Sequence, residues 1–125
     1  MEKEVINSKK VPAPIDPYSP ALRVENMIFV SGQLPVNPKT EEIVEGDIEA
    51  QARMSLENLK AVLEPYLAGM ENVVKTTIFL KDMNNFIRVN KVYGEYFKDK
   101  YSARSCIEVS RLPKDAEIEI EAIAF

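Results

Sequence analysis

The sequence lacks histidine, and this absence removes several classes of active site at once. None of the 125 residues is a histidine, so Ser-His and Cys-His nucleophilic sites and the common histidine zinc sites are excluded. The chain has one cysteine, so sites that hold a metal through several thiolates are excluded as well. Any catalysis must therefore use carboxylates, arginine, lysine, tyrosine, hydroxyl groups, the single thiol or the backbone.

The cysteine content and the lack of a long apolar run indicate a reducing compartment. One cysteine cannot form a disulfide within the chain. No apolar stretch of about 18 residues, the length that spans a membrane, occurs. The N-terminal stretch "MEKEVINSKKVPAP" is too charged for a secretory signal. We therefore expect a cytoplasmic protein.

The charge balance disfavours nucleic acid as the main ligand. The net charge is -4 and the isoelectric point is about 5.0, and the lysines are scattered, whereas phosphate-backbone binders gather basic residues on one face. With 46% hydrophobic and 29% charged residues and only four glycines, the composition is that of an ordinary globular protein. Its length predicts a single domain over residues 1–125.

Two helices are predicted from capping residues and apolar spacing. Asp47 is a plausible N-cap, and apolar residues follow it at steps of three or four from Ile48 to Tyr66. Pro65 is expected to disfavour helical geometry at the residue before it, and Gly69 suits a C-terminal stop. The second helix has Phe86, Val89, Tyr93 and Phe97 on its apolar stripe and Asp82 or Asn84 as its cap.

The remaining apolar segments predict five strands. They are two short strands in residues 21–34 around a turn at Glu25 and Asn26, a buried strand at Asn72–Leu80, and strands at Arg104–Ser110 and Glu117–Phe125. Residues 11–21, which hold four prolines, predict a loop of fixed shape. The order β, β, α, β, α, β, β favours an α+β fold with one mixed sheet and both helices on the same face.

Alternation in the last two predicted strands suggests where charges gather. Residues two apart share a face of a strand, so Arg104 and Cys106 lie opposite Ile107, and Glu119 lies opposite Ile120. If the isoleucines face the helices, then Arg104, Cys106 and Glu119 share the helix-free face. That face is either solvated or covered by another subunit, in which case the charged residues line a pocket between subunits.

Two weaker signals lie elsewhere in the chain. Asn90 falls close to the apolar stripe of the second helix, where a buried amide needs partners; it is either a satisfied structural asparagine or a site residue. Ser31 and Gly32 end a predicted strand, and glycine permits close approach of a backbone or a ligand. By themselves these two residues indicate only a turn.

Several segments, in order along nearly the whole chain, together resemble the reactive intermediate deaminase family, known as Rid or YjgF/RidA. They are "PYSPA", "SGQLPVNP", "NVVKTTIFL", "FIRVNKVYGEYF" and "ARSCIEVSRLPKDAEIEIEAIA". The last block is the most specific of them. The resemblance implies a chorismate-mutase-like fold, a homotrimer whose sheets line a central barrel, and three clefts between subunits.

The same resemblance implies an activity and a set of site residues. Arginine-containing members hydrolyse enamines and imines released by pyridoxal-phosphate enzymes, such as 2-iminobutanoate and 2-iminopropanoate, to 2-oxo acids and ammonia, without a metal or organic cofactor. The residues that match the family's pocket are Arg104, Glu119 and Cys106 for catalysis, and Tyr18, Ser31, Gly32, Asn90 and Arg104 for substrate binding. Ser102 departs from the pattern, because family members commonly have proline there, and the segment before Arg104 is shorter than usual.

Two other functions remain open on the sequence. A non-catalytic trimer that binds carboxylate metabolites as a sensor or regulator would use the same cleft. A ribonuclease or inhibitor of translation, a function attached to some family members, is disfavoured by the acidic charge and the lack of histidine. The small-molecule deaminase with an intersubunit cleft is therefore the leading hypothesis.

Overall fold

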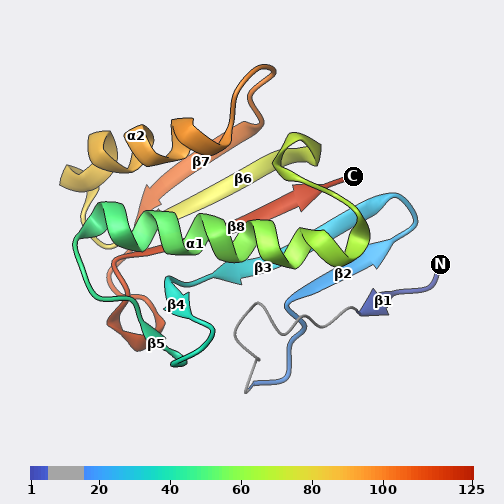
Figure 1. The fold of residues 1–125 in the computed structure, drawn as a ribbon, viewed down its shortest axis with the longest axis horizontal. Coiled ribbons are helices and arrows are strands. Elements are labelled where there is room, and N and C mark those ends of the chain that lie inside the picture. The colour runs from blue at the N-terminus through green and yellow to red at the C-terminus, as the bar shows by residue number, and fades with distance from the viewer. Residues whose placement is uncertain (6–15) are drawn as a thin grey trace.

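The computed structural model describes residues 1–5 and 16–125, and its centre is a six-stranded sheet (Figure 1). The strands run across the sheet in the order β1 (Glu4–Val5), β2 (Ala21–Val24), β3 (Met27–Gln33), β8 (Ile118–Ala124), β6 (Val73–Leu80) and β7 (Ala103–Glu108). A separate two-stranded ribbon contains β4 (Val36–Asn37) and β5 (Glu42–Ile43). The first part of the predicted proline-rich loop lies outside the described residues.

The sheet is mixed because one connection crosses over through a helix. β7 pairs parallel to β6, and every other pair in this sheet is antiparallel. The chain leaves β6, forms the second helix and returns along the outer side of β6, as a parallel pair requires. β8 then enters between β3 and β6. The predicted order of seven elements is confirmed, with three short additional strands.

The first helix, α1 (Ile48–Leu63), begins as predicted and ends differently. Asp47 caps it, since its Oδ1 accepts a hydrogen bond of 3.0 Å from the backbone N–H of Ala50. The expected loss of helical geometry before Pro65 is wrong, because the chain tightens there into a 3₁₀ turn with the proline in its first turn, where no N–H is needed. Leu67, at φ 58°, makes the left-handed stop in place of Gly69.

The second helix, α2 (Phe86–Tyr96), follows a 3₁₀ turn that Asp82 caps through the N–H of Asn84. Both helices pack on the same face of the sheet, as predicted, and α2 lies over β6 and β7 (Figure 1). Between the helices and the sheet lies the hydrocarbon core, where the fully buried side chains of the central strands include Ile78, Leu80, Ile118 and Ile120.

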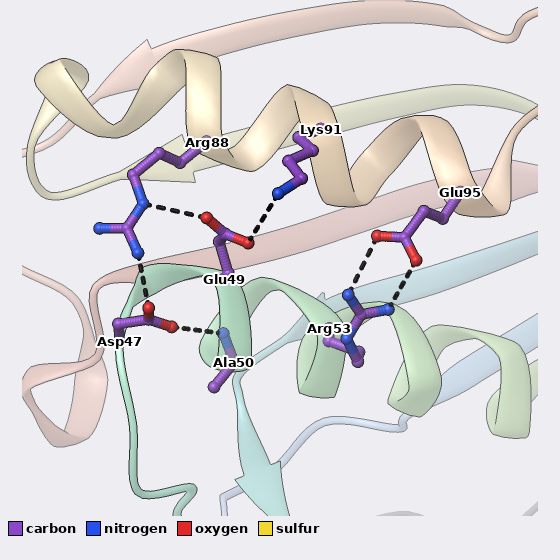
Figure 2. A network of polar contacts seen from close by, with 7 residues as sticks. All are labelled: Asp47, Glu49, Ala50, Arg53, Arg88, Lys91 and Glu95. Atoms are coloured by element: carbon purple, nitrogen blue, oxygen red, sulfur yellow. Dashed lines mark hydrogen bonds and ion pairs between the residues drawn. The ribbon is translucent and has the colours of Figure 1, made fainter.

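Ion pairs connect the exposed sides of the two helices (Figure 2). Arg53 of α1 donates two hydrogen bonds, of 3.1 and 3.0 Å, to the two carboxylate oxygens of Glu95 in α2. At the other end, Arg88 of α2 pairs with Asp47 and Glu49 at 2.5 and 3.2 Å. These pairs lie at the surface, where solvent screens them, so each adds little to the stability of the helix packing.

Within residues 1–5 and 16–125, no helix covers the opposite face of the sheet. Side chains on this face include Phe29 and Ile107, which are 44% and 46% exposed, and Phe79 and Ile123, which are half-buried. In the described part of the chain, neither helix has the length and apolar content needed to cross a membrane. The sheet thus has one face covered by its own helices and one partly apolar face left open.

Candidate functional site

Arg104 extends from the edge strand β7 toward α2. Its Nη1 donates a 2.7 Å hydrogen bond to Oδ1 of Asn90, and its guanidinium carbon lies 5.5 Å from the ring centre of Phe86 and 4.9 Å from that of Tyr93. Among the described residues the guanidinium has no further hydrogen-bond partner, and the residue is exposed. An oriented guanidinium with open N–H groups is suited to bind a carboxylate through two parallel hydrogen bonds.

Cys106 is the next residue of β7 on the same face. Its side chain is half-buried and packs against the core. Burial raises the pKa of the thiol, and the nearby positive charge of Arg104 opposes this only in part. The thiol is therefore protonated at neutral pH, which argues against a role as a thiolate nucleophile. We call Arg104, Asn90 and Cys106 the arginine cluster.

Glu119 lies on the other face of the sheet, against Gly32. A β-carbon added to Gly32 would come within 2.6 Å of Cδ and 2.9 Å of Cγ of Glu119. Any residue other than glycine at this position would therefore displace the carboxyl group of Glu119. Gly32 sits in an irregularity of the β3–β8 pairing between Val30 and Gln33, and such bulges redirect nearby side chains. We call Gly32 and Glu119 the glutamate cluster.

The environment of Glu119 changes its acidity. Burial is the main cause that raises the pKa of its carboxyl group, and the negative charge of Glu121 raises it further. A carboxyl group with a raised pKa exchanges protons closer to neutral pH than an ordinary glutamate does, as a general acid or base needs. The direction of this shift is compatible with a group that transfers protons.

Ser31 holds the loop that carries Tyr18 beside this cluster. The hydroxyl of Ser31 donates a 2.6 Å hydrogen bond to the carbonyl of Ser19, and its N–H donates to the carbonyl of Pro20 at 2.9 Å. Tyr18 is 53% exposed. Ser31 therefore anchors this loop at Ser19 through its hydroxyl group. Tyr18, the residue before Ser19, lies at the surface.

The prediction that Arg104, Cys106 and Glu119 share one face is wrong. Arg104 is paired in register with Thr76, which is 1% exposed under the helices, whereas Glu119 is paired with Phe79 on the helix-free face. The alternation within each strand was correctly read, but the face of β7 was not. β7 is an edge strand that does not adjoin β8, so its isoleucine, Ile107, is left half exposed on the open face.

The structure also adds residues that the sequence did not assign to the site. Phe86 and Tyr93 were placed on the apolar stripe of the second helix, where they do lie, but they also contact the guanidinium of Arg104. The hydroxyl of Tyr93 contacts Thr76 and Ser102. The spacing of Phe86, Asn90 and Tyr93 along one helix face was the signal available in the sequence.

Arg104 is exposed on one face of the sheet, and Glu119 is half-buried on the other. Three surface depressions of about 270, 290 and 340 Å³ are lined by residues other than Arg104 and Glu119. Among residues 1–5 and 16–125, no three histidine, cysteine or acidic side chains are grouped as metal ligands would be. The candidate site residues of a single chain thus lie in two groups on opposite faces of the sheet.

Comparisons with known proteins match the whole described chain. A family model named Endoribonuclease L-PSP matches residues 8–125. A RutC family protein of Pyrococcus abyssi is 54% identical over 125 residues, which cover 100% of this chain and 98% of that protein. The 2-iminobutanoate/2-iminopropanoate deaminase of Escherichia coli K12 is 50% identical over 124 residues, covering 97% and 96% of the two chains.

A solved structure gives the same result for the fold. The crystal structure of Escherichia coli TdcF with bound serine superposes with a TM-score of 0.92 at 42% identity, covering 97% of each chain. The mixed α+β architecture with two helices is therefore the architecture of these proteins. The bound serine is a small molecule that carries a carboxylate and an amino group.

Proposed function

This chain belongs to the endoribonuclease L-PSP family, the YjgF/RidA proteins, and on that premise we propose that it deaminates 2-imino acids. The proposed substrates are 2-iminobutanoate, 2-iminopropanoate and their enamine tautomers, which pyridoxal-phosphate enzymes release. The products are 2-oxo acids and ammonia. The observation that carries the proposal is the oriented, open guanidinium of Arg104.

Arg104 is proposed to hold the substrate carboxylate. Its plane is set by Asn90 and the two aromatic rings, so two parallel N–H groups face a ligand in one orientation. A lysine would supply the charge without fixing the plane. The serine bound to TdcF supports the assignment, because an amino acid shares the carboxylate and the adjacent nitrogen-bearing carbon with the proposed substrates.

Glu119 is proposed to manage the protons of the reaction. Its carboxylate takes a proton from water as the water oxygen bonds to the imine carbon, and the C=N bond becomes a C–N single bond. Glu119 then gives the proton to the nitrogen. This gives a carbinolamine. Glu119 next takes the proton of the new hydroxyl group and passes it to the amino nitrogen, so the C–N bond breaks, ammonia leaves, and the C–O bond becomes the carbonyl of the 2-oxo acid. Its raised pKa suits both steps. These steps use only side chains and water.

The two clusters lie on opposite faces of the sheet, so we propose that each active cleft forms between two copies of the chain in a homotrimer. The arginine cluster of one copy then meets the glutamate cluster of the next. The open face supports association, since it carries half-exposed apolar side chains such as Phe29 and Ile107. Burying such side chains between subunits is favourable by roughly 25 cal/mol per Å².

The other matched residues have proposed supporting roles. Asn90 orients Arg104 through the 2.7 Å hydrogen bond. Gly32 leaves room for Glu119, and Ser31 fixes the loop on which Tyr18 can cover the cleft. Cys106, with a protonated thiol, contributes its backbone and its packing. We expect the protein to work in the cytoplasm, where pyridoxal-phosphate enzymes generate imines.

A second function uses the same cleft without turnover. Serine bound to TdcF equally favours a trimer that binds carboxylate metabolites as a sensor. Ligand binding that depends on Arg104, without any acceleration of imine hydrolysis, would establish this alternative.

The test couples the purified protein to a threonine dehydratase and follows formation of 2-oxobutanoate. We expect an acceleration over buffer on the order of 100- to 10,000-fold, the contribution of one positioned acid-base group, and its loss in Arg104→Ala. Arg53→Ala, an exposed arginine that pairs with Glu95 on the helices, is the matched control and keeps full activity. No acceleration, or an Arg104→Ala variant as active as the control, would refute the deaminase.

A further inference from the structure

Arg104 rests on a platform built entirely from α2. Phe86, Asn90 and Tyr93 are spaced four and three residues apart, so they lie on one side of the helix. The Asn90 amide oxygen accepts the hydrogen bond of the guanidinium, while the ring of Tyr93, at 4.9 Å, is the closer of the two aromatic contacts. Tyr93 itself is only 6% exposed, so the guanidinium lies at the surface over a buried ring.

A chain of three hydroxyl groups fixes that ring. The hydroxyl of Tyr93 lies 2.7 Å from Oγ1 of Thr76 and 3.2 Å from Oγ of Ser102. Thr76 is 1% exposed and is the residue of β6 that pairs with Arg104 in the sheet. Phe97 stacks on the ring of Tyr93, with 4.3 Å between ring centres. The ring therefore has contacts at its hydroxyl end and on its face that prevent it from turning away.

We propose that Tyr93 is a positioning residue for Arg104: its ring, fixed by Thr76 and Ser102, sets the plane in which the guanidinium meets a substrate carboxylate. The inference rests on the proposed function, in which Arg104 binds the carboxylate. It goes beyond that function by assigning specificity for a planar carboxylate to a buried tyrosine that does not touch the substrate. Ser102, at the end of the hydroxyl chain, belongs to the same device.

The energetic reason is that a mobile guanidinium would bind a carboxylate more weakly than one held in place. A cation over an aromatic ring gains about 0.5–2 kcal/mol depending on its exposure to solvent, which corresponds to roughly 2- to 30-fold in affinity. Without the ring, Arg104 must be ordered by the ligand at the time of binding, and the ligand affinity falls by that cost. Because the carboxylate is held alike before and during the reaction, the loss is expected in KM and not in kcat.

The first test measures binding of 2-oxobutanoate, a stable carboxylate probe, to the full-length assembled protein by calorimetry. Tyr93→Leu removes the ring and is expected to weaken binding about 5- to 30-fold. Tyr93→Phe keeps the ring and removes the hydroxyl, so its affinity for 2-oxobutanoate should lie within about threefold of the wild type. Its melting temperature should fall, because Thr76 loses its hydrogen-bond partner. Ser102→Ala is expected to cost about twofold in affinity.

Tyr96→Leu is the matched control. Tyr96 lies on the same helix and bonds through its hydroxyl to Glu57 at 2.6 Å, away from Arg104. This variant should lose stability and keep the affinity for 2-oxobutanoate. In the coupled assay, Tyr93→Leu should raise KM with kcat within about threefold of the wild type, a split that general loss of structure would not produce.

The outcomes separate this proposal from the function on which it rests. If Arg104→Ala binds 2-oxobutanoate as tightly as the wild type, the carboxylate site itself is wrong. If Arg104→Ala loses binding but Tyr93→Leu retains it, only the role of Tyr93 is overturned. Should Tyr93→Leu fail to fold, Phe86→Leu removes the second, half-buried ring and tests the proposal in its place. A loss of affinity for 2-oxobutanoate of about 2- to 5-fold supports the aromatic platform. An unchanged affinity refutes it.

Discussion

The two faces of the sheet have different physical tasks. The face under the helices contains the hydrocarbon core, and at its edge strand it exposes Arg104 beside α2. The open face contains Glu119, together with apolar side chains that remain about half exposed in one chain, such as Phe29. The stability of the single chain thus comes from one face. The proposed acid-base group and the proposed subunit contacts come from the other.

In the proposed site, this contrast means that one chain contains both halves and cannot complete the site by itself. A sheet separates Arg104 from Glu119, so a small substrate cannot contact both within one copy. Association of copies would bring opposite halves together and cover the apolar open face in the same event.

Substitution of two isoleucines in β8 compares how much side-chain burial on each face contributes to stability. Ile120 is 0% exposed under the helices, and Ile123 is half-buried on the open face. Ile120→Ala is expected to lower the free energy of unfolding by about 2–5 kcal/mol, because a cavity remains in the core. Ile123→Ala should lower the free energy of unfolding by a smaller amount in dilute solution, and it should weaken the association of subunits. Denaturant unfolding at several protein concentrations measures both, and equal losses that do not depend on concentration would contradict the comparison.

Mixed assemblies test whether the two halves come from different copies. Arg104→Ala and Glu119→Gln are each expected to lose about 100-fold in activity, or about 2.7 kcal/mol. Co-expressed in equal amounts, the two variants should regain about a quarter of wild-type activity, because random trimers restore one cleft in each mixed assembly. The control mixes each variant with itself. No recovery in assemblies shown by mass to be mixed would place both groups in one copy.

Two glycines test the glutamate cluster without changing any charge. Gly32→Ala places a methyl group 2.6 Å from the Glu119 carboxyl carbon, so that side chain must move, and kcat is expected to fall about tenfold. Gly94→Ala, in α2, meets no atom within 4 Å and should raise stability by about 0.5–1 kcal/mol without affecting kcat. Steady-state kinetics and thermal unfolding distinguish them. Full activity in Gly32→Ala would remove Glu119 from the mechanism.

The acidity of Glu119 gives the smallest effect, visible only as a trend with pH. A carboxyl group whose pKa is raised on folding contributes stability below its unfolded pKa and loses it as pH rises through the folded pKa. Glu119→Gln should therefore gain unfolding free energy relative to the wild type as pH rises from below the ordinary value of 4.5. Glu121→Gln removes the neighbouring charge, so its free energy of unfolding should fall with rising pH as in the wild type, but by a smaller amount. A constant difference between Glu119→Gln and wild type would contradict the raised pKa.

Local sequence signals predicted the elements well where local physics decides them. Asp47 starts α1 because its carboxylate can accept from the free N–H groups of the first turn. The stripe from Phe86 to Tyr93 lies inward because its spacing matches the helical period. Asn90 was suspected to need a partner, and the structure provides Arg104 at 2.7 Å. The roles proposed for all the site residues remain predictions; they are Arg104, Asn90, Tyr18, Ser31, Gly32, Cys106 and Glu119.

Ser102 shows what local signals could not give. In the sequence it is a departure from the family pattern whose effect on the cleft is open. In the structure its hydroxyl lies 3.2 Å from that of Tyr93, which in turn contacts Thr76 from another strand. Residues 76, 93 and 102 meet only because β6, α2 and the start of β7 pack together. The sequence contains no spacing that joins them.

The sequence by itself determined the kind and order of the elements, the residues on each side of every strand, and the exclusion of histidine chemistry. These properties depend on neighbours a few residues apart. Only the tertiary structure decided that β8 lies between β3 and β6 and that β7 forms the edge. That arrangement turns Arg104 toward α2 and leaves Glu119 on the open face. The physical reason is that alternation fixes which residues share a side of a strand, whereas the pairing of strands far apart in the sequence fixes which side becomes the core.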